Sequence, residues 1–138
     1  MIDVWHISPM LRVIFFSLLW LTACQADETI SGYADRSAIY VLTSLNGDTF
    51  SANATLSFPE PGRISGRAPC NVFMGSQTKP YPWFGTGPLT STKRACPELK
   101  QEQAFFSALG EMTLAEVQGD TLILSNEAGA EMVFTAQK

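Results

Sequence analysis

Short runs of β-branched and aromatic residues, separated by turn residues, fill most of the chain. The first run, 38–45, ends at Asn46-Gly47, a pair that favours tight hairpin turns, and a short second strand follows it. Two further strands are predicted at 54–58 and 63–66, on either side of a turn that contains proline and glycine. This spacing predicts antiparallel hairpins.

The C-terminal part repeats this pattern. Runs at 114–117, 121–124 and 131–134 are joined by short loops that contain glycine, which predicts a three-stranded antiparallel meander. Between residues 68 and 89, prolines and glycines interrupt the pattern. Because proline cannot donate a hydrogen bond to a sheet, this stretch is predicted to be an irregular crossing or a set of short edge strands.

Residues 97–110 have the periodicity of an amphipathic helix. Proline suits the first turn, and the glycine at the end favours a stop. The apolar side chains Leu99, Phe106 and Leu109 form one stripe, which predicts that the helix packs against the sheet. The fold class is therefore α+β, mainly β: a curved antiparallel sheet of about seven or eight strands, forming a partial barrel, with one packed helix.

Two acidic residues of this helix, Glu98 and Glu102, raise the question of acid–base chemistry. Carboxylates on a charged helix usually face solvent. A glycosidase-like mechanism needs two acids that converge across a cleft, whereas the acidic residues here are scattered over turns and one helix face. We therefore expect both residues to be solvated, and we expect the protein not to be an enzyme.

The N-terminal segment has the layout of a secretory signal. One positive charge precedes an apolar run at 13–23, which is shorter than the about 20 residues that a membrane-spanning helix needs. The last residues, Leu21-Thr22-Ala23-Cys24, resemble the lipobox of bacterial lipoproteins, which implies cleavage before Cys24 and a lipid on its sulfur. The alternative is an ordinary signal peptide whose processing site happens to contain a cysteine.

This interpretation divides the chain into three parts. Residues 1–23 are predicted to be a lipoprotein signal peptide, 24–37 a lipidated flexible tether, and 38–138 the folded domain. The expected partner is the lipid bilayer, through an acyl anchor on Cys24, and the expected location is the bacterial cell envelope. Gln25 at the second mature position favours the outer membrane, with the domain facing the periplasm.

The net charge and the position of the single histidine limit the partners and the catalytic groups that the chain can have. The formal net charge of −4 argues against nucleic acid as a partner. The only histidine, His6, lies in the predicted signal peptide, so the mature chain has no imidazole to act as a base or as a metal ligand. No cofactor and no metal are expected.

Two cysteines, Cys70 and Cys96, remain besides the predicted lipidation site. In an oxidising compartment, an even pair in a small domain is most often a disulfide, and it would contribute about 3 kcal/mol of stability. A thiolate metal site is the alternative, but it would need two further ligands. We predict a disulfide.

Two segments are candidates for binding. Residues 79–85 hold three aromatic side chains among prolines and glycine, and stiff aromatic loops make good contact surfaces. The alternative is that Trp83 and Phe84 complete the core of a small domain. The aromatic residues are Tyr81, Trp83 and Phe84.

The second candidate is basic. Lys93 and Arg94 precede the predicted helix, whose N-terminus has unpaired N–H groups and a positive dipole, so the three features together could bind an anion. The alternative is two solvated side chains in front of a helix.

An ordered set of short motifs resembles the META domain family (HslJ-like) of small bacterial envelope proteins. The resemblance covers roughly residues 38–136. Tyr40 departs from it, because the family usually has tryptophan there, and so does Pro69, where glycine commonly precedes the Cys-Asn pair. The motifs are Leu45-Asn46-Gly47, Gly66 followed by Cys70-Asn71, Ser91-Thr92-Lys93-Arg94-Ala95-Cys96, Glu102 with Phe105, Phe106 and Leu109, and a closing hairpin around Leu122-Ile123-Leu124 and Gly129.

The resemblance implies a curved antiparallel sheet with one helix, a location in the envelope and no established enzymatic activity. We therefore expect a non-catalytic, lipid-anchored envelope protein with a role in stress-linked binding or scaffolding. Its partner would be an unidentified envelope protein or ligand. The alternative is a periplasmic inhibitor of a secreted hydrolase that uses the 79–85 loop.

Overall fold

The computed structural model describes residues 24–138, so the predicted signal peptide lies outside the described residues. Within that range no helix is long and apolar enough to cross a membrane. The elements are a 3-10 helix η2 (Ile30–Gly32), an α-helix α2 (Leu99–Glu111), and the strands β1 (Ile39–Leu45), β2 (Asp48–Thr49), β3 (Thr55–Ser57), β4 (Arg63–Arg67), β5 (Val72–Ser76), β6 (Thr90–Ser91), β7 (Leu114–Gln118), β8 (Thr121–Ser125) and β9 (Glu131–Gln137).

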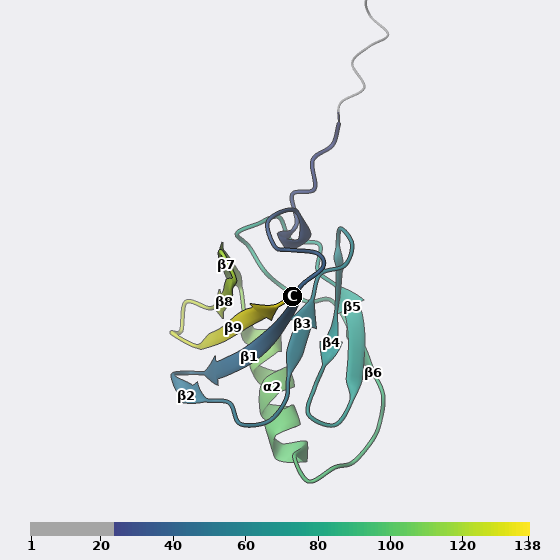
Figure 1. Ribbon diagram of the computed structural model, residues 1–138, viewed down its shortest axis with the longest axis vertical. Coiled ribbons are helices and arrows are strands. Elements are labelled where there is room, and N and C mark those ends of the chain that lie inside the picture. The colour runs from purple at the N-terminus through teal and green to yellow at the C-terminus, as the bar shows by residue number, and fades with distance from the viewer. Residues whose placement is uncertain (1–23) are drawn as a thin grey trace, which may run out of the picture.

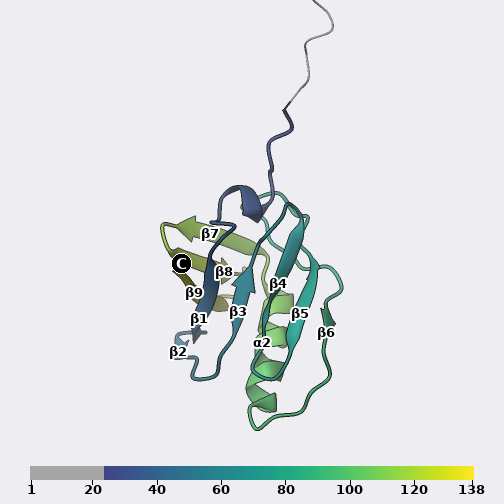
Figure 2. The same ribbon diagram turned by 45° about the vertical axis from the view of Figure 1, so that its right-hand side comes forward.

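All nine strands of the described chain belong to one antiparallel sheet. Eight of them run in the order β6-β5-β4-β3-β1-β9-β8-β7, and β2 pairs with β1 alone. The two edge strands, β6 and β7, do not pair with each other, so this curved sheet stays open (Figures 1 and 2). The predicted class, α+β and mainly β, is confirmed, with nine strands in place of seven or eight.

The predicted hairpins are present. In the β1–β2 turn, Asn46 and Gly47 both have positive φ angles, 52° and 84°, as the mirror-image hairpin turn requires. The meander at the C-terminus is also confirmed, because β8 pairs with both β7 and β9.

The stretch predicted to be irregular contains one regular strand, β5, which pairs with β4 from Arg67↔Val72 to Arg63↔Ser76. The sequence hides it because Gly75 interrupts the pattern of apolar residues. The structure explains this glycine: a Cβ there would lie 2.6 Å from a Leu89 side-chain carbon, so the missing side chain lets the later crossing pack on β5. The short edge strand β6 follows immediately after this stretch, outside the predicted range.

The core lies between the sheet and α2. Its largest fully buried aromatic side chains are Tyr40, Phe58, Phe105 and Phe134. Tyr40, which stands where the family usually has tryptophan, accepts a hydrogen bond at its hydroxyl from the Asp35 N–H over 2.9 Å. The smaller ring therefore fills the site and its hydroxyl pairs with a backbone donor.

Helix α2 begins two residues later than predicted and presents a different stripe to the core. Its buried residues are Glu102, Phe105 and Leu109, whereas Leu99 is 38% exposed. The stripe is therefore rotated relative to the prediction, which counted only apolar residues. The rotation places a carboxylate inside the protein.

The flexible tether predicted through residue 37 is wrong from Asp27 onward. Ile30 in η2 is 1% exposed and joins the core, and Ala34 is also buried. The Asp27 carboxylate accepts hydrogen bonds from the Thr29 and Ser31 hydroxyls and from Arg36. A run of small polar residues looks like a linker in sequence, but these side chains close a compact turn around one apolar residue.

Candidate functional site

The loop between β4 and β5 is joined covalently to the segment that precedes α2. Cys70 and Cys96 form the predicted disulfide, with their Cα atoms 5.5 Å apart. Pro69, the second departure from the family pattern, lies beside Cys70 in this loop. The bond therefore ties the β4–β5 loop to the start of the helix.

A buried carboxylate holds the same loop from the helix side. The Glu102 side chain accepts hydrogen bonds from the N–H groups of Cys70 (3.1 Å) and Asn71 (2.9 Å) at one oxygen. Its other oxygen accepts a 2.7 Å bond from the Asn71 side-chain amide. Glu102 is 5% exposed, so the expectation that it faces solvent is wrong. Without it, these donors would be buried and unpaired.

Asn71 connects the β4–β5 loop to the segment that precedes α2. Its side-chain oxygen accepts hydrogen bonds from the Arg94 N–H (2.6 Å) and the Thr92 hydroxyl (2.8 Å). Its amide also donates to the Arg94 carbonyl oxygen over 3.0 Å. The backbone of Arg94 is therefore fixed on both sides, while its side chain stays free to reach outward.

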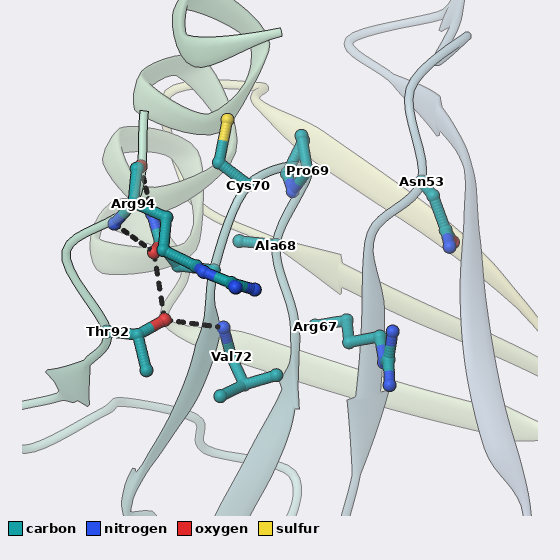
Figure 3. Close-up of a pocket in the computed structure, with 9 residues that line it drawn as sticks. Asn53, Arg67, Ala68, Pro69, Cys70, Val72, Thr92 and Arg94 are labelled. Carbon is teal, nitrogen blue, oxygen red and sulfur yellow. Dashed lines mark hydrogen bonds between the residues drawn. The ribbon is translucent and has the colours of Figure 1, made fainter. Parts of the chain in front are cut away.

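An open hollow of about 290 Å³ lies in front of this network. Arg67, at the end of β4, and Arg94 provide the two charged groups of its wall, and Figure 3 shows the Arg94 side chain extending between Ala68 and Val72. In residues 24–138 neither guanidinium forms an ion pair with a carboxylate. The lining consists of Asn53, Arg67, Ala68, Pro69, Cys70, Asn71, Val72, Thr92 and Arg94 and contains no acidic side chain.

The hollow only partly matches the predicted basic site. Arg94 lines it, whereas Lys93 is exposed and is not part of the lining. The N-terminus of α2 begins only at Leu99, after Glu98, and does not line the hollow either. The positive partner of Arg94 is Arg67 instead.

Arg67 was missed by the sequence analysis, although the pattern of β4 contains a signal for it. Side chains alternate between the two faces of a strand, and Ile64 is buried. Arg63 and Arg67 are both exposed, on the opposite face. Alternation thus places Arg67 on the surface, but only the fold brings it near Arg94, 27 residues away in sequence.

The predicted aromatic loop divides into an exposed and a buried part. Phe84 is 3% exposed and belongs to the core, while Trp83 is 56% exposed and lines a shallow hollow with Lys79 and Pro80. Tyr81 stacks on Tyr33 with ring centres 4.2 Å apart. The core alternative therefore holds for Phe84 and fails for Trp83.

Cys24, the predicted lipidation site, is exposed and is the free cysteine of the described chain. It lies three residues before Asp27, where the hydrogen-bonded N-terminal segment begins. In residues 24–138 no group of three His, Cys, Asp or Glu residues is placed to hold a metal ion.

Comparisons with solved structures agree on the fold. An NMR structure of a protein from Burkholderia xenovorans is 23% identical, with a TM-score of 0.59 over 82% of this chain and 84% of that one. A second NMR structure is 24% identical, with a TM-score of 0.57 over 72% of this chain and 89% of that one. At these identities the likeness shows the fold alone. No curated protein matches the sequence.

A crystal structure of a DUF4847 family protein from Bacteroides vulgatus is more distant, with 14% identity and a TM-score of 0.50 over 59% of this chain and 57% of that one. The family model of the META domain matches residues 36–138, which includes every strand, α2 and the disulfide. The chain therefore belongs to the META domain family.

Proposed function

We propose that this protein is a lipid-anchored, non-catalytic binding protein of the bacterial envelope that holds an anionic group of its partner in the Arg67–Arg94 hollow. One observation carries the proposal: two guanidinium groups without a carboxylate partner in the described chain flank a concave surface that has no acidic lining. Guanidinium groups match the planar geometry of carboxylates and phosphates. The role would be stress-linked, as the family resemblance implies.

The envelope location draws support from two features. The lipobox-like sequence Leu21-Thr22-Ala23-Cys24 predicts lipidation, and Cys24 is exposed at the start of the described chain. A disulfide between Cys70 and Cys96 suits an oxidising compartment outside the cytoplasm.

A binding role fits the chemistry of the site better than catalysis. Glu102, which binds Asn71 in the lining of the hollow, is buried and already accepts three hydrogen bonds, so it is not free to move a proton. Glu98, in a neighbouring depression beyond Pro69 and Asn53, has no carboxylate partner across a cleft. The two charged groups in the wall of the hollow, the guanidinium groups of Arg67 and Arg94, are donors, which suits recognition of an anion.

The geometry does not favour the inhibitor alternative. An inhibitory loop has to protrude and enter a cleft, but the 79–85 loop is packed onto the body by Phe84 in the core and by Tyr81 stacked on Tyr33. Only Trp83 of its three aromatic residues is strongly exposed.

Lipidation is tested in cells. Labelling with a fatty-acid analogue should tag the wild type, and Cys24→Ser should abolish the label and release the protein from membranes. A wild-type protein that stays unlabelled and soluble would refute the anchor.

The hollow is tested by titrating the isotopically labelled protein with inorganic phosphate and, separately, with acetate, and following the backbone amide signals of residues 67–72 and 92–94. Binding of either anion should shift these signals, and the stronger of the two identifies phosphate or carboxylate as the recognised group. Arg67→Ala with Arg94→Ala should weaken binding at least about tenfold, the loss of roughly 1.4 kcal/mol.

The matched control is Arg63→Ala. Arg63 is an exposed arginine on the same strand, 4.0 Å from the Glu60 carboxylate and outside the hollow. It should leave anion binding unchanged. Equal weakening by the control, or no response to either anion, would contradict the proposed site.

A further inference from the structure

One end of the molecule is built from two segments that are far apart in sequence. The Tyr81 N–H donates to the Glu28 carbonyl oxygen over 2.7 Å, and the Tyr81 ring stacks on Tyr33. The chain enters the folded body at this end (Figures 1 and 2). We call it the N-terminal surface, and its exposed side chains include Tyr33, Arg36, Lys79, Pro80 and Trp83 as well as the acidic Glu28.

Trp83 and Tyr33 are unusual for surface residues. They are 56% and 55% exposed, the highest values among the large hydrophobic side chains of the described chain. Each combines a large apolar ring with a polar N–H or O–H group, the combination that concentrates at the boundary between lipid and water. Lys79 carries no ion pair in residues 24–138 and adds a positive charge beside them.

The chain between Cys24 and the body is too short to hold this end away from a membrane. The Asp27 carboxylate is tied to Thr29, Ser31 and Arg36, so the fixed part of the chain begins there. Three residue steps separate Cys24 from Asp27, and an extended chain spans at most about 10 Å over that length. A lipid on Cys24 would therefore keep the N-terminal surface within about one head-group layer of the bilayer.

We propose that the N-terminal surface rests on the head-group layer of the membrane that carries the Cys24 lipid, with the rings of Trp83 and Tyr33 at the lipid–water boundary. This inference rests on the proposed lipidation of Cys24. The domain is then held in one orientation, and does not swing on a long tether.

The orientation determines where the hollow points. Strand β4 starts next to the N-terminal surface, where the Gly62 N–H approaches the Thr29 hydroxyl at 3.4 Å, and it ends at Arg67 in the wall of the hollow. A strand of this length advances the chain by about 13 Å. The hollow therefore lies at the end of the domain away from the membrane, within reach of soluble partners.

The test uses the protein isolated from membranes, in which Trp83 is the only tryptophan once the chain is cleaved before Cys24. It is reconstituted into phosphatidylcholine vesicles, with and without bromine atoms on the acyl chains close to the head groups. Bromine quenches indole fluorescence at short range. Trp83 emission should fall at least about twofold in the brominated vesicles, because aromatic rings of this kind lie at the head-group level.

The matched control moves the tryptophan to the other end. In a Trp83→Phe and Lys93→Trp variant, the anchor is unchanged and the indole replaces an exposed side chain near the hollow. Its emission should be the same in both kinds of vesicle. Unquenched Trp83, or equal quenching at both positions, would overturn the orientation.

A spacer variant tests the short connection itself. A Gly-Ser insertion of about twelve residues after Ala26 adds a mean reach of about 19 Å. Quenching of Trp83 should decrease, and quenching that rises would contradict a surface held down by its tether.

Failure of the anchor and failure of the orientation give different results. Mass spectrometry of the N-terminal peptide shows whether Cys24 carries acyl chains. If it does not, the free Cys24 thiol is coupled to a maleimide lipid in the same vesicles, and the quenching comparison then tests the orientation alone.

Discussion

The two ends of this domain are held by different kinds of interaction. At the end with the hollow, a disulfide and the buried Glu102 carboxylate fix the β4–β5 loop. At the N-terminal surface, residues 27–36 are held by a half-exposed ion pair between Arg36 and Asp27, a few hydroxyl hydrogen bonds and one buried isoleucine. One backbone hydrogen bond from Tyr81 and the stack of its ring on Tyr33 add to these contacts. The first set is shielded from water and partly covalent, whereas most of the second competes with water.

This difference shows how a small domain can leave charged side chains free to bind a partner. Around Glu102, backbone and amide donors satisfy the buried carboxylate. No arginine side chain is therefore needed inside the protein to pair with it, and Arg67 and Arg94 stay at the surface. At the N-terminal surface, by contrast, the Arg36 guanidinium forms an ion pair with the Asp27 carboxylate and helps to hold the turn. We therefore expect the hollow to resist perturbation more strongly than the N-terminal surface.

The largest expected effect comes from removing the disulfide. Cys70→Ala with Cys96→Ala should lower the free energy of unfolding by about 3.5 kcal/mol, because the unfolded chain regains the freedom of a closed loop. Urea denaturation measures the loss, and far-UV circular dichroism should show the strands intact. A loss near zero would contradict this account, because it would mean that the bond does not restrict the unfolded chain.

Glu102→Gln should cost about 3 kcal/mol, because the new amide can accept at only one oxygen while three donors, two of them in buried bonds, converge on it. The exposed Glu98→Gln is the matched control and should cost less than about 0.5 kcal/mol. When Glu102→Gln is combined with the two cysteine substitutions, the loss of stability should be smaller than the sum of the separate losses, since both changes release the same β4–β5 loop. Strict additivity would contradict a shared role.

Ile30→Ala tests the other end and should cost about 2 kcal/mol, the lower range for truncating a buried isoleucine. The effect should be local: amide hydrogen exchange should accelerate in residues 27–36 and stay unchanged in β8 and β9. Ile39→Ala, at a position that is 49% exposed, is the control and should change neither. Faster exchange throughout the sheet would show that both ends unfold as one unit.

The smallest effect is expected at Asp27. Burial acts to raise the pKa of this carboxyl, but hydrogen bonds from Ser31 and Thr29 and the charge of Arg36 outweigh it and lower the pKa below its ordinary value of 3.8. Its contribution to stability is therefore complete above that ordinary value and is lost as the pH falls through the lowered pKa. The amide signal of Thr29, whose N–H donates to the Asp27 carboxylate, should thus shift on acidification below about pH 4.

Asp27→Asn should cost about 1 kcal/mol, confined to residues 27–36, and should remove this acid response. The amide keeps one acceptor oxygen, so the turn is weakened and not abolished. An acid response that persists in the variant would assign it to another carboxyl.

Much of the fold was predictable because its signals are local. The Asn46-Gly47 turn and the alternating residue pattern of β8 and β9 predict the strands directly. The pair of cysteines that remains besides Cys24 predicts the disulfide. Glu102 was misjudged because its partners are backbone N–H groups, which no sequence pattern displays. Residues 27–36 were misjudged because their polar side chains pair among themselves, and composition alone does not distinguish such a turn from a linker.

The candidate site was less predictable than the fold. Arg94 was identified from the charge pair before the helix, but its partner Arg67 comes from another strand, and only the β4–β5 pairing and the Asn71 bonds bring them to one hollow. For the aromatic loop, the sequence shows three rings and a stiff backbone. Which ring faces inward depends on the approach of the loop to β7, where the Phe84 N–H donates to the Thr113 carbonyl oxygen.

The contact between the 79–85 loop and β7 affects whether copies of the protein can pair through the edges of their sheets. An open sheet has two edges, and exposed edges invite copies of a chain to pair and aggregate. Here the β7 edge is occupied by residues 82–84, through the Trp83↔Leu114 bridge and the bond from the Ala115 N–H to Pro82, while β6 is only two residues long and follows Pro88. Neither edge offers a long row of free backbone groups, which would let many copies share one surface without polymerising.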